Sequence, residues 1–450
     1  MNFDRLRELI LERAIQGKLV PQLESEPPVS QIECKYKNLP FKTPKKWGFA
    51  NLADLIEFLD YGTSTKCHAT KEVEDVPVLR MCNIENGTVN LENLKYANRD
   101  LIEISRPYLQ YGDLIFNRTN SLELVGKCAP FLIDEKYSFA SYLIRVRLKP
   151  TINAKYLSYW INSNICRQTQ IYPKVSKQVG QANFSGSKLK QIVVPLPPIE
   201  EQLRIVFKID DLFAKIKLLE NSYRELQKLK EALRKLILQK AVQGKIVPQL
   251  ESEPEVEQIG DDPEDVPFAI PEKWKWVNLH STLKAISDGS HNPPPNVGHG
   301  VPVLSAKNVI NGIIDTNSVT RWTTEEQWSI EDKKIHIQFG DVLLTIVGTI
   351  GRTAVVPNDC EKFMLQRSVC VMKPKECVNP EFLALILNSP SLFEWIMDHA
   401  SGTAQKGIYL KTVKQIPIPL PSIEEQRRIV AKLNELLGSI SQLEQTISTP

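Results

Sequence analysis

Side chains that could contact a nucleic acid gather in short polar segments of this sequence. One segment is Gly62-Thr63-Ser64-Thr65-Lys66, and a second is Ser287-Asp288-Gly289-Ser290-His291-Asn292. Lys and Arg can donate to guanine edges, Asn and Gln can pair with adenine, and Ser and Thr can hold phosphates. Both segments therefore have the chemistry of a nucleic-acid contact. For any single residue in them, a polar surface loop without a partner is an equally good interpretation.

Further polar segments lie at matching places in the two halves of the chain. Residues 116–120 and 345–352 each follow a Gly-Asp strand, and residues 174–183 and 401–407 each precede a Lys-Gln-Ile anchor. Arg118 and Arg352 could instead form surface salt bridges. The candidate DNA-contacting residues are Thr63, Ser64, Lys66, Asn117, Arg118, Lys174, Lys177, Gln181, Ser290, His291, Asn292, Thr349, Arg352, Thr403, Gln405 and Lys406.

Catalytic and metal-binding patterns are not convincing anywhere in the sequence. The run Asn292-Pro293-Pro294-Pro295 is similar to the Asn-Pro-Pro-aromatic motif of amino-methyltransferases, but Pro295 stands where the stacking aromatic residue is needed. No nucleotide-binding GxxxxGK[ST] run occurs, and the eight cysteines form no CxxC pair. His291 and His299 are best interpreted as loop histidines. We therefore predict no catalytic residues, no metal site and no cofactor in this chain.

Composition limits the possible classes of protein but does not decide the function. The 450 residues carry a formal net charge of +3, with 42% hydrophobic and 24% charged residues. These values are typical of a folded protein with two or more cores, and the charge is compatible with nucleic-acid binding without proving it. The N-terminal segment has no apolar signal-peptide core, and no segment is apolar enough to span a membrane. We expect a cytoplasmic location.

An internal duplication organises the elements that must position these segments. Residues 10–27 and 237–254 are identical at 14 of 18 positions, and residues 195–202 match residues 419–426. Fainter pairs lie between these anchors, namely Pro44-Lys45-Lys46-Trp47 with Pro271-Glu272-Lys273-Trp274, Val76-Pro77-Val78-Leu79 with Val301-Pro302-Val303-Leu304, and Gly112-Asp113-Leu114 with Gly340-Asp341-Val342. Two similar frameworks that carry different loops fit two different but similarly shaped targets. Drift after duplication is the alternative.

A long helix is predicted from Glu200 toward Gly244. Acidic residues occupy its first turn, and apolar residues recur at heptad spacing. Roughly 42 helical residues would span about 60 Å, so we expect a partner, the C-terminal helix, running antiparallel across a pseudo-two-fold axis. An ordinary core helix is the alternative. The predicted helix–helix spacer residues are Ile209, Leu212, Ile216, Leu219, Tyr223, Leu226, Leu433, Leu436 and Ile440.

These elements predict an α+β fold of two similar globular domains separated by a pair of long antiparallel coiled-coil helices. Gly17 and Gly244, each followed by a proline four residues later, are expected to end helices. The predicted parts are an N-terminal helix and cap at 1–25 that repeats 228–250, a globular domain at 26–195, a central helical spacer at 196–250, a second globular domain at 251–419, and a C-terminal helix at 420–450.

The repeated segments carry a family resemblance. The Pro-Leu-Pro-x-Ile-Glu-Glu-Gln-x-Arg-Ile-Val starts at 195–206 and 419–430, the Gln-Gly-Lys-(Leu/Ile)-Val-Pro-Gln segments, and the Pro-x-x-Trp entries at Trp47 and Trp274 are similar to those of the specificity (S) subunit of type I restriction-modification enzymes. The resemblance covers essentially the whole chain in order and spacing.

The resemblance implies two target-recognition domains, each reading one half of an asymmetric, bipartite double-stranded DNA target. It also implies that the helices dock modification (methyltransferase) subunits, two in number, and that restriction/translocase subunits join them. S-adenosylmethionine, ATP and Mg would then belong to the partner subunits, and no membrane is involved. Base-contacting residues vary in this family, so none is transferred to this sequence.

Other functions remain open at this point. The chain could be the reader subunit of another DNA-modifying system, or a self-contained DNA methyltransferase or nuclease. It could also be a scaffold that holds protein partners through its helices without binding DNA. The DNA target, its gap length, and whether the complex restricts or only methylates are not encoded in any pattern found here.

Overall fold

The computed structural model describes residues 2–29, 41–85, 87–105, 108–178, 181–310, 312–402 and 406–448, without the side chains of 104–105, 177–178 and 444–448. The chain divides into a first unit, Met1–Tyr223, and a second unit, Arg224–Pro450. Helix α7 (Ile199–Val242) has 44 residues and continues from the first unit into the second. In the described parts of the chain, no helix is both long and apolar enough to span a membrane.

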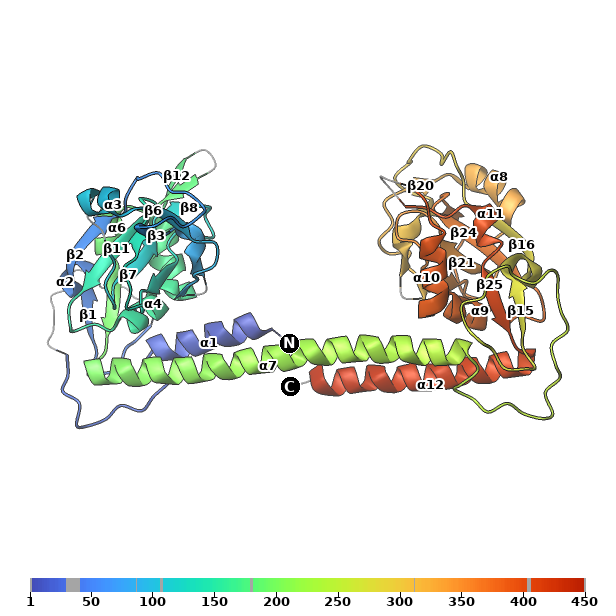
Figure 1. Cartoon of the computed structure of the whole chain (residues 1–450), viewed down its shortest axis with the longest axis horizontal. Coiled ribbons are helices and arrows are strands. Elements are labelled where there is room, and N and C mark those ends of the chain that lie inside the picture. The colour runs from blue at the N-terminus through green and yellow to red at the C-terminus, as the bar shows by residue number, and fades with distance from the viewer. Residues whose placement is uncertain are drawn as a thin grey trace. The chain divides into compact units, whose positions relative to one another are not determined.

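The first unit is a mixed α+β domain with a helix at each end of its chain segment (Figure 1). Its helices are α1 (Phe3–Ile15), α2 (Leu52–Leu55), α3 (Arg99–Ser105), α4 (Ala154–Asn162), α5 (Asn164–Cys166), α6 (Gly186–Lys190) and the start of α7. Its strands are β1 (Gly48–Asn51), β2 (Ile56–Tyr61), β3 (Asp75–Leu79), β4 (Ile84–Glu85), β5 (Thr88–Val89), β6 (Lys95–Asn98), β7 (Leu114–Asn117), β8 (Thr119–Asn120), β9 (Cys128–Pro130), β10 (Ser138–Phe139), β11 (Leu143–Leu148), β12 (Ser176–Gln178), β13 (Gln181–Asn183) and β14 (Val193–Leu196).

The second unit repeats most of this order of elements, without counterparts of strands β8, β12 and β13. Its helices after α7 are α8 (Glu325–Ile335), α9 (Pro380–Leu387), α10 (Pro390–Asp398), α11 (Leu410–Val413) and α12 (Ile423–Ser448). Its strands are β15 (Lys275–Asn278), β16 (Leu283–Asp288), β17 (Val301–Leu304), β18 (Val309–Ile310), β19 (Ile313–Ile314), β20 (Trp322–Thr323), β21 (Val342–Thr345), β22 (Thr353–Val355), β23 (Met364–Leu365), β24 (Val369–Pro374) and β25 (Pro417–Leu420).

Sheet topology confirms the predicted duplication. The four-stranded sheet β2-β11-β7-β9 of the first unit matches β16-β24-β21-β22 of the second, and β10-β3-β6 matches β23-β17-β20. In both three-stranded sheets the central strand, β3 or β17, pairs in parallel with β10 or β23. Both units therefore present their loops from the same framework, as the shared sequence pairs predicted.

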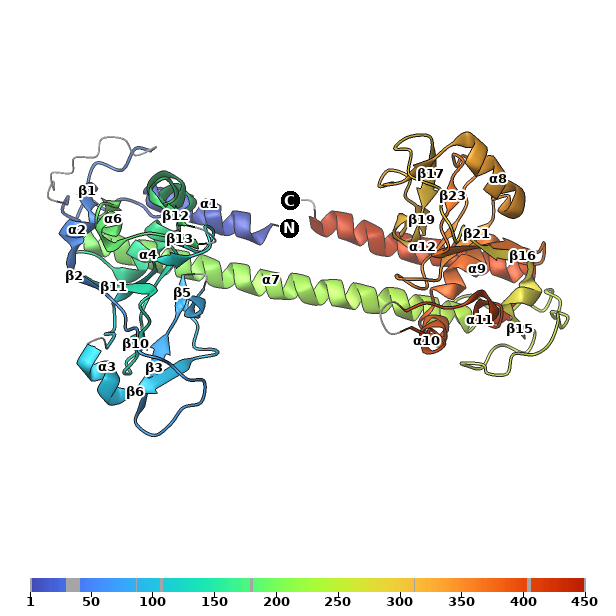
Figure 2. The same cartoon turned by 90° about the horizontal axis from the view of Figure 1, so that it is seen from above.

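Long antiparallel helices are present in both units, and their partners differ. In the first unit α1 runs antiparallel to the start of α7, and in the second unit α12 runs antiparallel to the end of α7 (Figures 1 and 2). Phe3 stacks edge-on with Tyr223 at 6.1 Å between ring centroids, and Arg7 donates to Glu220 at 3.1 Å. The expected single pair of α7 with the C-terminal helix therefore extends over the second half of α7 only.

The predicted spacer residues fall into two groups. Ile209, Ile216, Leu433 and Ile440 are buried, and Ile209 and Leu433 belong to the cores of their own units. Leu219 is 55% exposed, while Leu212, Tyr223, Leu226 and Leu436 are half-buried. The heptad pattern thus marks core contacts near the domains and weaker packing along the middle of α7.

Glycine ends both repeated helices as predicted. Gly17 has φ +69° and Gly244 has φ +67°, and the N–H of the following lysine bonds back to Arg13 O at 2.8 Å and to Lys240 O at 2.9 Å. This pattern is a Schellman cap, in which the left-handed residue is best filled by glycine. A Cβ on Gly244 would lie 2.5 Å from Pro271 Cγ, so the cap packs directly on the Pro-x-x-Trp segment.

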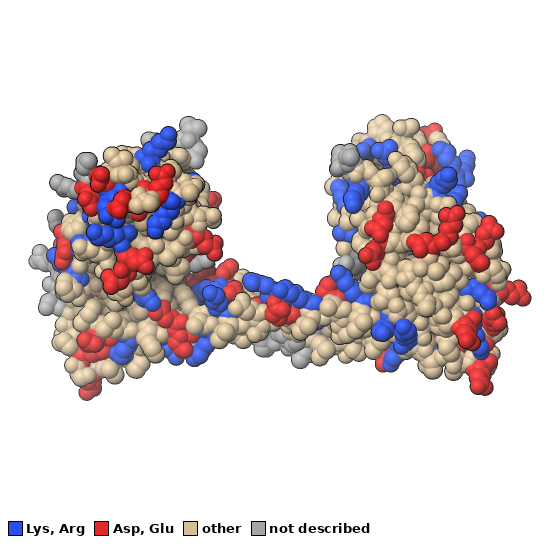
Figure 3. All heavy atoms as spheres, viewed as in Figure 1, with Lys and Arg blue, Asp and Glu red and all other residues tan. Residues whose placement is uncertain are grey.

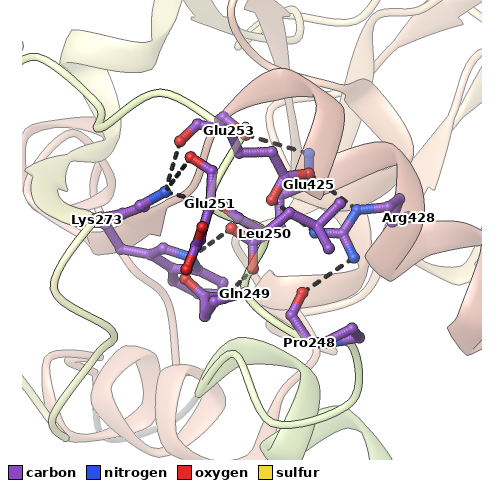
Figure 4. Close-up of polar contacts among 10 residues, drawn as sticks. Pro248, Gln249, Leu250, Glu251, Glu253, Lys273, Glu425 and Arg428 are labelled. Carbon is purple, nitrogen blue, oxygen red and sulfur yellow. Dashed lines mark hydrogen bonds and ion pairs between the residues drawn. The ribbon is translucent and has the colours of Figure 1, made fainter.

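The repeated sequence motifs meet in one polar cluster per unit, here called the motif cluster. Figure 4 shows the motif cluster of the second unit. In the second unit Arg428 of α12 donates to Glu253 at 2.6 Å and to Pro248 O at 3.1 Å, while Lys273 Nζ donates to three carbonyls, including Glu253 O at 2.8 Å. Glu425 accepts from Trp274 Nε1 at 2.9 Å. The helix start, the linker and the Trp segment are thereby joined.

The first unit contains the same motif cluster. Arg204 donates to Glu26 at 2.7 Å and to Pro21 O at 2.9 Å, and Lys46 Nζ donates to Glu26 O at 2.7 Å. Glu201 takes the place of Glu425 and accepts from Gln22. Burial raises the pKa of both glutamates. The Trp274–Glu425 hydrogen bond is not repeated, since Trp47 Nε1 and Glu201 Oε2 are buried without a hydrogen-bond partner. Because unpaired buried polar groups are costly, the contacts of Arg204, Lys46 and Gln22 that are matched in the second unit give a physical reason for the strong likeness of the repeated segments.

Candidate nucleic-acid interface

Two of the predicted polar segments of the first unit meet through one shared segment. Thr63 N–H donates to Phe139 O at 2.8 Å, and Ser141 N–H donates to Thr63 O at 2.9 Å. Arg118 N–H donates to Tyr142 O at 3.1 Å. Residues 140–142, just before β11, therefore hold residues 62–66 and 117–120 side by side.

The third polar segment joins them through a small sheet. Strand β13 pairs antiparallel with β12 and with β8, placing Ala182 opposite Asn120 and Asn183 opposite Thr119. Lys188 Nζ fixes the base of this hairpin by donating to Lys174 O at 2.6 Å and to Ser176 Oγ at 2.7 Å. We call residues 62–66, 117–120, 140–142, 176–178 and 181–183 the first loop cluster.

Exposure divides the candidates of the first loop cluster. Ser64, Lys66 and Gln181 are exposed, and Lys174 and Arg118 are half-buried. Thr63 and Asn117 are buried, so their side chains are placed to support the loops. Asn117 Nδ2 donates to Leu124 O at 3.4 Å, for example. The side chain of Lys177 lies outside the described residues.

The second unit builds an equivalent loop cluster from different residues. Ser290 N–H donates to Leu365 O at 2.8 Å, and Ile346 N–H donates to Ser368 O at 2.9 Å. Gly348 N–H donates to Lys406 O at 3.1 Å. Residues 287–292, 345–352, 366–368 and 406–407 form the second loop cluster.

The candidates of the second loop cluster are mostly accessible. His291, Asn292, Thr349 and Lys406 are exposed, and Ser290 and Arg352 are half-buried. Thr403 and Gln405 lie outside the described residues. His291 Nε2 lies 2.7 Å from Asp288 Oδ2, which brings a carboxylate into this cluster where the first one has an aromatic ring.

Aromatic residues at the first loop cluster were not among the predicted candidates. Tyr61 is 44% exposed and Tyr142 is 50% exposed, and the Arg118 guanidinium lies 4.7 Å from the centroid of the Tyr61 ring. A cleft beside them is lined by Thr65, Cys67, Arg80, Met81 and Tyr142, among others. Tyr61 ends strand β2 and Tyr142 precedes strand β11, so nothing in the sequence distinguishes them from ordinary strand residues.

Charges of both signs are mixed on the face of the molecule drawn in Figure 3. On the face shown in Figure 3, Lys and Arg side chains lie among Asp and Glu side chains on both units and along α7. A protein that binds DNA chiefly through phosphates carries a basic face. The surface shown here instead fits recognition by particular loops with few cationic groups.

Three potential metal ligands also meet near the first loop cluster. The ligand atoms of His68, Glu72 and Asp75 lie within 4.8 Å of one another. His68 Nε2 is 2.6 Å from Asp75 Oδ2, and Glu72 N–H donates to the same oxygen at 2.8 Å. The hydrogen bond from His68 lowers the pKa of Asp75. These contacts order the turn before β3, and we assign the group a structural role.

Comparison with known proteins gives the family. A model described as the type I restriction modification DNA specificity domain matches residues 44–228 and 272–449. The chain is 23% identical over 420 residues to the EcoKI specificity subunit of Escherichia coli K12, covering 90% of this chain and 85% of that protein. It is 26% identical over 270 residues to the EcoBI specificity subunit, covering 59% of this chain and 56% of that protein.

Solved structures agree in fold. The chain matches a structure titled as the basis of assembly and conformational transition of a type I R-M system, with a TM-score of 0.64 at 20% identity, covering 90% of this chain and 94% of that one. It matches the HsdS subunit of Thermoanaerobacter tengcongensis with a TM-score of 0.55 at 20% identity, covering 90% and 93% of the two chains. With its two matched specificity domains, the chain belongs to the family of type I restriction-modification DNA specificity subunits.

Proposed function

We propose that this chain reads an asymmetric, bipartite double-stranded DNA target, with one loop cluster on each half-site. One observation carries the proposal: two units that share a four-stranded and a three-stranded sheet of the same strand order each gather unlike polar segments beside those sheets. Side chains that differ on a shared framework are suited to different base sequences, because base edges are distinguished by their hydrogen-bonding patterns. We place the chain in the cytoplasm with the DNA of a prokaryotic cell.

We further propose that the chain is not a catalyst and works with modification and restriction subunits. Two modification subunits would supply methyl transfer from S-adenosylmethionine, and restriction/translocase subunits would use ATP and Mg. Exposed apolar side chains on α7 support a docking role for the helices, since Phe207 is 77% exposed and Leu218 and Leu229 are 67% exposed. Apolar side chains exposed together on one helix are typical of a protein interaction surface.

Selection from a random DNA pool tests the reading function. The full chain, tagged and purified with the subunits that accompany it, is mixed with duplexes of random sequence, and the retained duplexes are sequenced. We expect a motif of two specified segments with an unspecified gap. Replacing the exposed residues of the second loop cluster, His291→Ala with Asn292→Ala, should change one segment only. A pool retained without any sequence preference rejects the reading function.

The same preparation tests the absence of catalysis. The chain purified without other subunits should neither methylate nor cut DNA when S-adenosylmethionine, ATP and Mg are supplied, and the complex should do at least the first. Methylation or cleavage by the isolated chain would instead establish a self-contained enzyme.

A further inference from the structure

Arg118 is held in place from several sides. Its guanidinium lies 4.7 Å from the centroid of the Tyr61 ring, its N–H donates to Tyr142 O at 3.1 Å, and its carbonyl accepts from Phe184 N–H at 2.8 Å. The Tyr61 hydroxyl in turn accepts from Gly186 N–H at 3.1 Å. A guanidinium stacked on a fixed ring loses little further freedom when it binds a ligand.

Arg118 also differs from its neighbours in having no acceptor. The other arginines described in the globular part of the first unit each reach an oxygen: Arg80 reaches Asn93 O, Arg99 reaches Glu74, Arg145 reaches Asp60, Arg147 reaches Asp113, and Arg167 reaches Val125 O. Within the described residues the guanidinium of Arg118 has no hydrogen bond or ion pair. A buried nitrogen without a partner also occurs in Arg80 and Arg167, but their guanidiniums are bonded through other nitrogens, whereas that of Arg118 is not.

That combination points to a ligand outside the chain. Arginine stays protonated in proteins and offers five N–H donors in a planar fork. In the described part of the chain only Nε of Arg118 is buried without a partner, so Nη1 and Nη2 remain accessible to solvent or to a ligand. Arg118 lies in the first loop cluster, between β7 and β8, where the proposed DNA would supply acceptors for its N–H groups.

The second unit lacks this arrangement at the matching positions. Asp288 ends β16 where Tyr61 ends β2, as shown by their pairing with the second residues of β24 and β11, Cys370 and Ile144. Ile346 follows β21 where Arg118 follows β7. The second loop cluster has the Asp288–His291 pair instead. The two clusters therefore offer a ligand different donor and acceptor groups.

We propose that Arg118 is a specificity-determining residue that donates two N–H groups to O6 and N7 of one guanine in the half-site read by the first unit. Tyr61 acts as the positioning residue that sets the plane of the guanidinium. The proposal rests on the proposed function and deepens it. A planar fork is suited to these two acceptors of guanine, whereas a phosphate contact would carry no base preference.

The experiment compares Arg118→Lys and Tyr61→Leu with the unchanged chain in the pool selection described above, each purified with its accompanying subunits. Lysine keeps the charge but not the fork. We expect Arg118→Lys to reduce the preference for guanine at one position of one half-site by about 5- to 150-fold, which corresponds to one bidentate contact. The other half-site and the salt dependence of binding should stay unchanged. Tyr61→Leu should weaken the preference at the same position by less.

Matched controls separate positioning from folding. Tyr61→Phe keeps the ring, so it should keep the guanine preference. Arg99→Ala removes the same charge from an exposed arginine that already pairs with Glu74 at 2.6 Å, and should leave the motif unchanged. Thermal unfolding of every variant shows whether the first unit is intact. Loss of the guanine preference in Arg118→Lys with an unchanged unfolding temperature supports the proposal.

Other outcomes overturn the proposed guanine contact, and they can be told apart from a failure of the proposed function. A motif that stays unchanged in both Arg118→Lys and Arg118→Ala overturns the guanine contact while leaving the reading function standing. If Arg118→Ala weakens all sequences equally and lowers the salt dependence, the arginine binds a phosphate, and the proposal is wrong. An unchanged chain that selects no sequence overturns the proposed function itself.

Discussion

Replacing Gly244 by alanine should destabilise the second unit strongly, because two effects add at this position. Gly244 has φ +67°, a left-handed conformation that costs an L-residue with a Cβ about 1–2 kcal/mol. The new Cβ would lie 2.5 Å from Pro271 Cγ and 3.1 Å from Trp274 Cζ2, and such overpacking costs about 1–3 kcal/mol. We therefore expect Gly244→Ala to lower the free energy of unfolding by about 2–5 kcal/mol.

Two glycines of the same unit supply matched controls. Gly340 has φ +83°, but its nearest atom to an added Cβ is Pro380 Cγ at 3.8 Å, so Gly340→Ala should show the backbone effect alone, about 1–2 kcal/mol. Gly438 lies inside α12 with nothing within 4 Å of an added Cβ. Gly438→Ala should stabilise the unit by about 0.5–1 kcal/mol, because alanine favours the helix.

Urea denaturation of the full chain measures the three changes. The unit structure predicts that the midpoint of the second unit's transition shifts with little change in slope. The order of stability should be Gly438→Ala above the unchanged chain, then Gly340→Ala, then Gly244→Ala. If Gly244→Ala loses no more stability than Gly340→Ala, the close contact between the helix cap and the Pro-x-x-Trp segment is not a real constraint, and our reasoning about the motif cluster is refuted.

Two further predictions concern the motif cluster of the second unit. Arg428→Ala leaves the buried Glu253 carboxylate without its guanidinium and should lower the free energy of unfolding in urea by roughly 1–3 kcal/mol. Lys432→Ala breaks an exposed pair with Glu435 and should lower it by less than about 0.5 kcal/mol. Equal losses in the two variants would contradict the burial argument. Burial raises the pKa of Glu425 from its usual 4.5, so the folded chain holds this proton longer than the unfolded chain. The contribution of Glu425 to stability should thus fall as pH rises above 4.5, and Glu425→Gln should remove that part of the decline; parallel pH profiles for the two chains would reject it.

Local signals in the sequence were sufficient for two helix ends but not for a third. Glycine followed by proline marked the caps at Gly17 and Gly244, and both are left-handed in the structure. The helical segment that begins at Ala154 is interrupted, with α4 ending at Asn162. The Ser163 side chain accepts from Cys166 N–H at 3.2 Å and so starts a new turn. A serine that caps a helix this way competes with the helix continuing through it.

The sequence predicted the candidate contact segments, but not which of their side chains are exposed. The equivalent places of the three polar segments in the two copies could suggest that they belong to one surface, and backbone hydrogen bonds do join them. Which side chains face outward could not be predicted, because Thr63 and Asn117 are buried by residues far away in the sequence. Tyr61 was missed for the same reason: its role depends on Arg118 and Gly186, more than 50 and 120 residues away.

The continuity of α7 follows from the way the two copies are joined. In the aligned copies, residues 199–223 correspond to α12 and the end of α7 corresponds to α1, so α7 combines the last helix of one copy with the first helix of the next. No glycine or proline occurs between Ile199 and Val242. Without a breaker at the junction, each new residue adds a backbone hydrogen bond to an existing helix, which is favoured over starting a new helix. The duplication thereby gives each unit a matching helix pair and a motif cluster, and selection can alter the loops of one unit without disturbing these shared contacts.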